Sequence, residues 1–313
     1  SGNWIALQNL AIIYSDGANL PRDVKKANKY LKLSVKSNDA DALLSLGILY
    51  YEGKAIQHNY KESKKCFELA AKLDNSYAYM NLAKIYSDGR YEKICYSRTF
   101  KYLVEAARMN NSYAFLCLGD LYLDGKGVEQ NFNKAIEYYQ KGAELNNSDA
   151  YLNLGLLYYQ RKGVKKDFQK AKEYFELSGS KYNAIALYEL GKLYYDGQNI
   201  EQDYKKALEF FTLSAEKNNI DSNYYVGNIY ENGKGVQIDI PKAIQYYLKC
   251  NQLHEIDKND IEKKFVMRDV NLFTYKYIEN YNIHRSANDL GLIYATESEY
   301  LNINSATEFL KDA

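Results

Sequence analysis

The sequence predicts an all-α fold, a right-handed superhelical solenoid of antiparallel helix pairs. Three observations support this prediction. A tyrosine-centred phrase recurs every 36 residues along the chain, and only 2 of the 313 residues are proline, the residue that breaks helix interiors. Apolar residues within each repeat also follow the i, i+3 and i+4 spacing of an amphipathic helix. A fixed period of this length is the sequence signature of a repeat solenoid.

The recurring phrase predicts the first helix of each pair. It reads LAIIYSDG in the first repeat and VGNIYENG in the seventh, with a constant interval between its tyrosines. A small residue stands three positions before each tyrosine. Because glycine or alanine at that position gives up side-chain packing, and glycine also lowers helix propensity, we expect a neighbouring helix to approach closely there. The repeat tyrosines are Tyr14, Tyr50, Tyr86, Tyr122, Tyr158, Tyr194 and Tyr230.

The ends of both helices are marked by capping residues. A glycine follows most of the tyrosine phrases, at the position of a left-handed C-terminal cap. An Asp or Asn then opens the second helix as its N-cap, except in the third repeat, where Cys95 takes this position. Another Asp or Asn lies in every turn into the next repeat. The expected N-caps of the second helices are Asp23, Asn59, Asn131, Asp167, Asp203 and Asp239.

The fourth repeat carries the whole pattern, LGDLYLDGKGVEQNFNKAIEYYQKGAELNN, from Leu118 to Asn147. It resembles the Sel1-like repeat family, a tetratricopeptide-like group. The resemblance implies a solenoid of helix pairs whose members act as adaptors for other proteins. It implies no particular partner.

Three segments are expected along the chain. Residues 1–254 form seven repeats, and residues 284–313 form a partial eighth repeat around Tyr294. Residues 255–283 lack the glycine and the LG phrase, so we interpret them as an irregular helical insertion or a degenerate repeat. The chain opens in phase with a first helix at Trp4, which suggests that it is part of a longer protein.

Composition and spacing argue against several classes of function. The formal net charge is only +1, whereas a nucleic-acid partner usually requires a basic surface. No stretch approaches the roughly 18 apolar residues of a membrane span. The histidines lack metal-ligand spacing, so no catalytic site, metal or cofactor is expected. An enzyme acting through the irregular segment is a remaining alternative, and a loss of activity on replacing His254 or His284, which flank that segment, would support it.

The four cysteines fall at four different phases of the repeat. A disulfide-stapled array would place its pairs at a recurring phase. We therefore expect free thiols and a reducing compartment, the cytoplasm, with the lumen of the endoplasmic reticulum as the alternative.

A binding groove is expected on the first helices, which line the concave wall in solenoids of the family's type. At about 100° per residue, positions −9, −6, −5, −2 and +1 from the repeat tyrosine lie opposite the core stripe. Amides on this wall can satisfy the backbone of an extended peptide, while apolar pockets and tyrosines anchor its side chains. The predicted groove residues are Asn81, Lys84, Asn153, Tyr159, Lys192, Tyr195, Leu116, Leu152 and Tyr188.

Two questions stay open at this point. Residues at position −6, which are Leu116, Leu152 and Tyr188, could instead pack in the interior between neighbouring repeats. The predicted function is a non-catalytic adaptor that binds a peptide or protein segment in the groove. The alternative is a structural subunit that binds a folded partner or itself through the convex face or the ends of the array.

Overall fold

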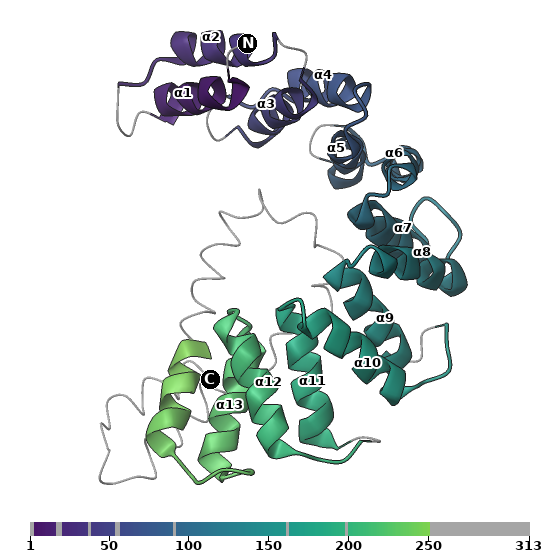
Figure 1. Ribbon diagram of the computed structural model, residues 1–313, viewed down its shortest axis with the longest axis vertical. Coiled ribbons are helices and arrows are strands. Elements are labelled where there is room, and N and C mark those ends of the chain that lie inside the picture. Colours follow the sequence, from purple (N-terminus) through teal and green to yellow (C-terminus); the bar gives the residue numbers. More distant parts are fainter. Residues whose placement is uncertain are drawn as a thin grey trace. The chain divides into compact units, whose positions relative to one another are not determined.

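The computed structural model describes residues 3–250, apart from 17–20, 37–38, 54–56, 90–91, 161–162 and 198–199 (Figure 1). Within these residues all regular structure is helical, and no strand occurs. The chain divides into two compact units, Ser1–Leu145 and Asn146–Ala313. The expectations for residues 255–283 and 284–313 lie outside the described residues.

The first unit contains four helix pairs. They are α1 (Trp4–Asp16), α2 (Val24–Ser34), α3 (Ala40–Glu52), α4 (Tyr60–Ala71), α5 (Ser76–Asp88), α6 (Tyr96–Arg108), α7 (Ser112–Asp124) and α8 (Phe132–Glu144). The second unit contains α9 (Ser148–Gln160), α10 (Phe168–Gly179), α11 (Ala184–Asp196), α12 (Tyr204–Glu216) and α13 (Ile220–Asn232). Residues 240–250 are also helical.

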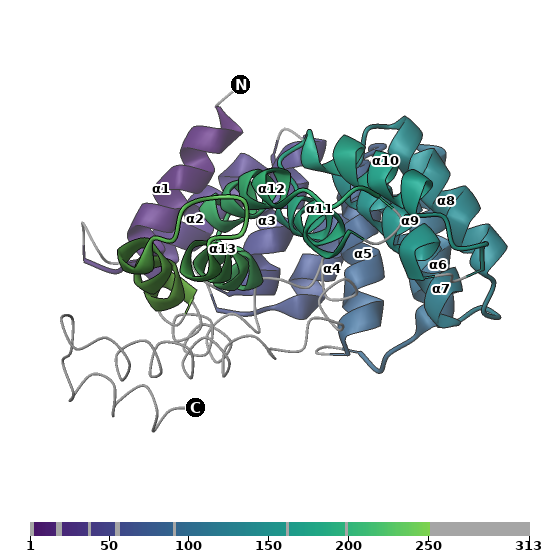
Figure 2. The same cartoon turned by 90° about the horizontal axis from the view of Figure 1, so that it is seen from below.

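Each odd-numbered helix packs along the helix that follows it, as α7 does on α8 and α11 on α12 (Figures 1 and 2). Within each unit, second helices also contact the first helix of the following pair: α4 contacts α5, α6 contacts α7, α10 contacts α11 and α12 contacts α13. The predicted all-α array of antiparallel helix pairs is confirmed. The right-handed sense of its superhelix stays a prediction.

The predicted caps are present at the helix ends. The Asp23 carboxylate accepts a hydrogen bond from the Lys26 backbone N–H at 2.9 Å, at the start of α2. Gly53 ends α3 in the left-handed region with φ of 64°, where a residue with a side chain would be strained. Cys95 forms no side-chain cap on α6, so its N-terminus lacks the stabilisation that the other described second helices receive.

The small residue three positions before the repeat tyrosine lies against a large residue of the second helix. A Cβ atom added to Gly155 would lie 2.5 Å from Phe175 Cε1, which is closer than a real contact allows. Five glycines face an aromatic ring in this way: Gly47–Phe67, Gly119–Tyr139, Gly155–Phe175, Gly191–Phe211 and Gly227–Tyr247. In the two repeats with alanine, the large partner is a leucine in the same core cluster: Ala11 with Leu31 and Ala83 with Leu103.

The repeat tyrosines are structural, which accounts for much of the tyrosine content. Tyr122 stacks on Tyr138 of α8 with ring centroids 5.6 Å apart, and Lys134 Nζ lies 5.0 Å from the Tyr122 centroid. The same arrangement of rings recurs in both units. The stacked pairs are Tyr14–Tyr30, Tyr86–Tyr102, Tyr122–Tyr138, Tyr158–Tyr174, Tyr194–Phe210 and Tyr230–Tyr246.

Candidate functional site

The three groove candidates at position −6 are interior residues. Leu116, Leu152 and Tyr188 are 4%, 0% and 6% exposed. Leu152 packs in one core cluster with Phe175 of α10, and the Tyr188 ring lies 6.0 Å from the Phe211 ring of α12. The structure thus has the interior packing that the sequence left as an alternative, and the candidate site is described without these three residues.

In the first unit, Lys84 of α5 belongs to a small polar cluster. Its Nζ lies 5.2 Å from the centre of the Tyr51 ring of α3. The Tyr51 hydroxyl donates a hydrogen bond to the Asp88 carboxylate of α5. We call Tyr51, Lys84 and Asp88 the first wall cluster. Asn81, one turn before Lys84, is half-buried and donates from Nδ2 to the Tyr77 carbonyl at 2.8 Å.

In the second unit, Lys192 of α11 occupies the position equivalent to Lys84. Lys192 Nζ lies 3.5 Å from Glu189 Oε2, and the ion pair is largely shielded from water, with side chains 26% and 11% exposed. Burial raises the pKa of the half-buried Tyr159 hydroxyl of α9, and the charges of Lys192, Glu189 and Asp196 also act on it. Asn153, on the same helix as Tyr159, is 7% exposed.

A further group of contacts joins α11 to α13. The Tyr195 hydroxyl donates to Asn228 Oδ1 at 2.7 Å, and Lys234 Nζ donates to the same oxygen at 3.1 Å. Lys234 Nζ also lies 4.6 Å from the centre of the Tyr195 ring. We call the six residues of the second unit that make these contacts the second wall cluster: Tyr159, Glu189, Lys192, Tyr195, Asn228 and Lys234.

Burial shifts the ionisation of the charged pair in the second wall cluster. Desolvation raises the pKa of the Glu189 carboxyl, against the attraction of Lys192, and the nearby Asp221 and Asp196 add to the rise. Burial acts to lower the pKa of the Lys192 amine, but Glu189, Tyr159 and Tyr225 outweigh it and raise that pKa. The pair therefore favours a charged Lys192 beside a carboxylate that is poorly solvated.

The two wall clusters follow one rule of spacing. A tyrosine directly after the repeat tyrosine approaches the residue two positions before the next repeat tyrosine, 33 residues along the chain. This occurs for Tyr51 with Lys84, Tyr159 with Lys192, and Tyr195 with Asn228. The groove prediction omitted Tyr51, Asp88, Glu189, Asn228 and Lys234. Tyr51, Glu189 and Asn228 stand at the wheel positions +1, −5 and −2 that were expected to face the groove, although they were not among the named residues. Asp88 and Lys234 stand outside those positions.

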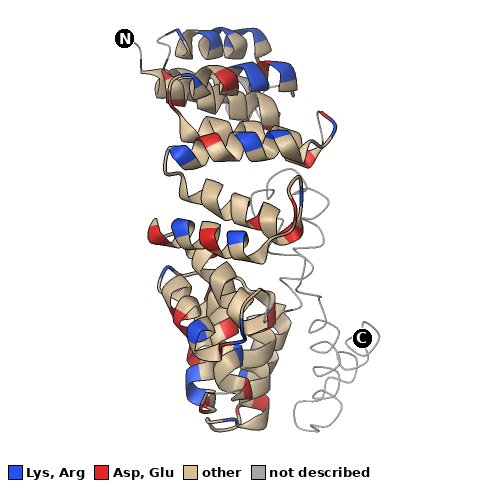
Figure 3. Cartoon of the chain, turned by 90° about the vertical axis from the view of Figure 1, so that its right-hand side faces the viewer, with Lys and Arg blue, Asp and Glu red and all other residues tan. Residues whose placement is uncertain are grey.

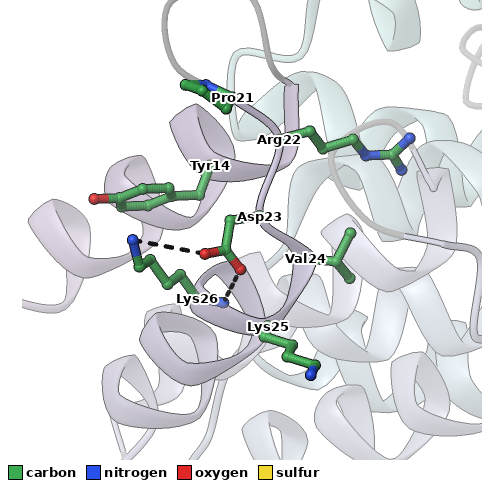
Figure 4. Close-up of a pocket in the computed structure, with 7 residues that line it drawn as sticks. All are labelled: Tyr14, Pro21, Arg22, Asp23, Val24, Lys25 and Lys26. Atoms are coloured by element: carbon green, nitrogen blue, oxygen red, sulfur yellow. Dashed lines mark hydrogen bonds and ion pairs between the residues drawn. The ribbon is translucent and has the colours of Figure 1, made fainter.

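Two surface hollows occur at equivalent positions of different repeats. One, of about 480 Å³, is lined by Tyr14, Asp23 and Lys26 at the start of α2 (Figure 4). The other, of about 390 Å³, is lined by Tyr194, Asp203 and Lys206 at the start of α12. In Figure 4 the Asp23 carboxylate is bonded to both the backbone and the amine of Lys26. Asp23 and Lys26 therefore form the N-terminal cap of α2.

The described residues hold no group of three His, Cys, Asp or Glu side chains that could bind a metal ion. His58 stacks on Tyr60 with ring centroids 5.7 Å apart, while His254 and His284 lie outside the described residues. Cys66, Cys95, Cys117 and Cys250 are free thiols.

A search of the described helices finds none with the length and apolar character needed to cross a membrane. In the ribbon of Figure 3, Lys and Arg positions are interspersed with Asp and Glu positions along the described helices. The expectation against a nucleic-acid partner stays a prediction.

Comparison with known proteins follows the repeat pattern. The Sel1 repeat model matches seven consecutive segments: residues 4–39, 40–75, 76–111, 112–147, 148–183, 184–219 and 220–249. A search of curated proteins finds no match.

Two solved structures share the fold. A Sel1 repeat protein from Oxalobacter formigenes superposes with a TM-score of 0.71 at 24% identity, covering 84% of this chain and 76% of that one. A protective antigen of uropathogenic Escherichia coli strains, which displays the Sel1-like repeat (SLR) fold, superposes with a TM-score of 0.61 at 24% identity, covering 99% of this chain and 68% of that one. The seven matched repeats span well over half of the length of this chain, which therefore belongs to the Sel1 repeat family.

Proposed function

We propose that the chain is an adaptor that binds an extended segment of a partner protein on the wall formed by its first helices. Sel1 repeat proteins are generally non-catalytic protein-interaction scaffolds. The proposed contacts are Asn81 and Lys84 in the first unit and Tyr159, Lys192 and Tyr195 in the second, with Asn153 beside them.

The observation that supports this proposal is the second wall cluster itself. Its ion pair of Glu189 and Lys192 is largely removed from water. A buried ion pair seldom stabilises a fold more than apolar residues of the same size, because desolvation offsets the attraction. The leucines and alanines of the neighbouring core already hold α9 to α12 together. The ion pair of Glu189 and Lys192 is therefore better explained by binding of a partner than by stability of the fold.

The chemistry of the clusters suits a peptide in extended conformation. Such a peptide presents backbone N–H and C=O groups that must be satisfied once water is excluded. Lys192 and Lys234 can donate to carbonyl oxygens, and the buried Glu189 carboxylate holds the Lys192 amine in place. The half-buried rings of Tyr159 and Tyr195 offer apolar area with little loss of side-chain freedom.

The test is selection of binding peptides from a random dodecapeptide library with the full 313-residue chain. We expect the selected peptides to bind the Lys192→Ala and Tyr195→Ala variants at least tenfold more weakly. Lys205→Ala is the matched control, because Lys205 is an exposed lysine of α12 and lies off the wall. Equal binding to wild type and both wall variants would contradict the proposal.

A further inference from the structure

We propose that the chain self-associates through the outer faces of its second helices. The basic outer face of α2 and α4 in one copy docks on the acidic outer face of α10 and α12 in another copy. This surface shares no residue with the wall clusters, and the argument for it does not depend on the proposed function.

The outer positions of the second helices change the sign of their charge midway along the array. The residue fifteen positions after the repeat tyrosine is Lys in the first three repeats and Glu in the next three. The residue seven positions further on is basic in the first three repeats, and it is Glu, Ser and Glu in the next three. In chain order, the first position holds Lys29, Lys65, Lys101, Glu137, Glu173 and Glu209, and the second holds Lys36, Lys72, Arg108, Glu144, Ser180 and Glu216.

Both positions lie on the outer side of their helix. Seven residues are close to two helical turns, so side chains seven apart lie on the same side. All of these side chains are exposed, in α2 as in the repeats inside each unit, so their exposure is a feature of every repeat. The four lysines of α2 and α4 are called the basic face, and the three glutamates of α10 and α12 the acidic face: Lys29, Lys36, Lys65 and Lys72, and Glu173, Glu209 and Glu216.

Exposed leucines accompany the charges on both faces. Leu69 of α4 lies four residues after Lys65 and is 45% exposed. Leu177 of α10 and Leu213 of α12 take the same repeat position on the acidic face, and they are 47% and 43% exposed. Large apolar side chains within a charged surround are typical of protein interfaces, where the apolar residues form the centre and the charges the rim.

Local ion pairs do not cancel the charge of these faces. Lys65 Nζ lies 2.7 Å from Glu62 Oε1, but both side chains are exposed to water, and such pairs contribute little. Glu173 accepts a hydrogen bond from the neutral amide of Gln169 at 3.3 Å. The sequence of α2, VKKANKYLKLS, contains four lysines and no acidic residue.

The two faces are also held in comparable ways. Leu31 of α2 and Cys66 of α4 belong to one core cluster, and α10 and α12 both pack on α11. Each face is therefore built from the second helices of two consecutive repeats. Its charged and apolar positions recur at the same interval, so those of one face can meet those of the other in register.

This match favours a second copy of the chain as the occupant. A nucleic acid would neutralise the lysines of the basic face but would leave Leu69 without an apolar partner, whereas the acidic face supplies both carboxylates and leucines. The formal net charge of +1 adds little overall repulsion between copies. Because the two faces differ, the contact is heterologous, and association continues into oligomers or closes into a ring.

Sedimentation velocity of the full 313-residue chain tests for this association. We expect the weight-average sedimentation coefficient to rise with protein concentration up to about 100 µM, in a buffer of about 50 mM salt. At about 500 mM salt the association should weaken at least tenfold, because exposed charges are then screened.

Charge reversal on one face at a time identifies the surfaces. Lys29→Glu with Lys65→Glu makes both faces acidic, and Glu173→Lys with Glu209→Lys makes both basic, so each double variant should self-associate at least tenfold more weakly. Mixing the two variants should restore association, because one still has the native acidic face and the other the native basic face. Exposed substitutions of this kind seldom unfold a protein, and recovery on mixing shows that both variants are folded.

Two controls separate these faces from other surfaces. Lys93→Glu with Lys165→Glu changes the net charge by the same amount as the reversal of the basic face, at two exposed lysines of loops, and it should leave self-association unchanged. Lys192→Ala should also leave it unchanged, which distinguishes failure here from failure of the proposed wall function.

The proposal is overturned if the wild-type chain stays monomeric over this range, or if the two reversed variants do not associate when mixed. Equal weakening by the loop control would also overturn it, because the effect would then follow net charge alone. A monomeric wild type that binds a DNA duplex of about 20 base pairs through Lys29 and Lys65 would assign the basic face to nucleic acid instead.

Discussion

In five of the described turns between repeats, the residue just before the N-cap of the next first helix has a left-handed backbone conformation. Four of the five are Asp or Asn, namely Asp74, Asn110, Asn146 and Asn218, with φ between 56° and 62°. These residue types tolerate the left-handed region because their short polar side chains bond to the local backbone. Tyr182 occupies the fifth turn at φ of 60°, with its side chain 70% exposed.

We expect Tyr182→Asn to stabilise the chain. Asparagine tolerates the left-handed backbone better than tyrosine, which should raise the free energy of unfolding by about 1 kcal/mol. The lost contact between Lys217 and the Tyr182 ring offsets part of this gain. Urea unfolding should show a net gain of about 0.5 kcal/mol. The reverse change, Asn146→Tyr, should lower stability, and a loss of stability in Tyr182→Asn would contradict the argument.

The thiols at Cys66 and Cys95 should differ in reactivity. Burial raises the pKa of Cys66 to about 11, whereas a hydrogen bond from Ser97 and the backbone N–H of Arg98 lower the pKa of Cys95. Because the thiolate is the reactive form, iodoacetamide at pH 8 should modify Cys95 first, as peptide mass mapping can show. Raising the pH towards 11 should increase labelling of Cys66. Equal rates at pH 8 would contradict these assignments.

At the scale of the helix pair, close approach depends on a small residue facing a large one. Glycine faces Phe or Tyr in five repeats, and alanine is paired with leucine in two. The added methyl of alanine and the smaller volume of leucine compensate each other, so both combinations fill the same space at native packing density.

This complementarity predicts strong coupling between Gly155 and Phe175. Gly155→Ala should destabilise the chain by about 1 to 3 kcal/mol, because overpacking against Phe175 outweighs the roughly 1 kcal/mol that alanine adds in helix propensity. Adding Phe175→Leu to this variant should recover most of the loss. Urea unfolding of the four combinations measures the coupling. If the changes in the free energy of unfolding caused by Gly155→Ala and Phe175→Leu simply add, the two side chains do not compete for the same volume.

Most of the element-scale structure could be predicted from the sequence, because its signals are local. Capping residues, glycine C-caps and the period of the apolar stripe each act within one or two helical turns. Whether Leu152 faces the groove or the interior could not be decided from the sequence, since the angle on a helical wheel does not say how far a neighbouring helix covers the residue. For the same reason, the wheel identified Lys192 as a wall residue but not the ion pair that buries it against Glu189.

At the scale of the whole molecule, the array is a series of junctions in which each repeat contacts its neighbours. Helix α1 carries the same residue types at the junction positions as the other first helices, but Leu10 and Ile13 are 38% and 39% exposed. The stability of such a chain depends on the interfaces that are formed, so equivalent residues of different repeats can contribute very differently.

We therefore expect the same substitution to affect stability very differently at Leu10 and Leu82, which are equivalent positions in α1 and α5. Leu82→Lys places an unpaired charge in the core and should cost roughly 3 to 5 kcal/mol. Leu10→Lys should change stability by less than about 0.5 kcal/mol, as exposed substitutions do. Thermal and urea unfolding compare the two variants. A large loss in Leu10→Lys would show that this face is covered within the chain.

The proposed binding of a partner segment to the wall can be tested by hydroxyl-radical footprinting of tyrosines with and without a selected peptide. Tyr159 and Tyr195 belong to the second wall cluster, whereas Tyr182 is highly exposed in a turn and serves as the internal control. We expect the oxidation of Tyr159 and Tyr195 to fall severalfold when the peptide is bound, with Tyr182 unchanged. Binding without protection of these two tyrosines would place the ligand elsewhere and contradict the claim.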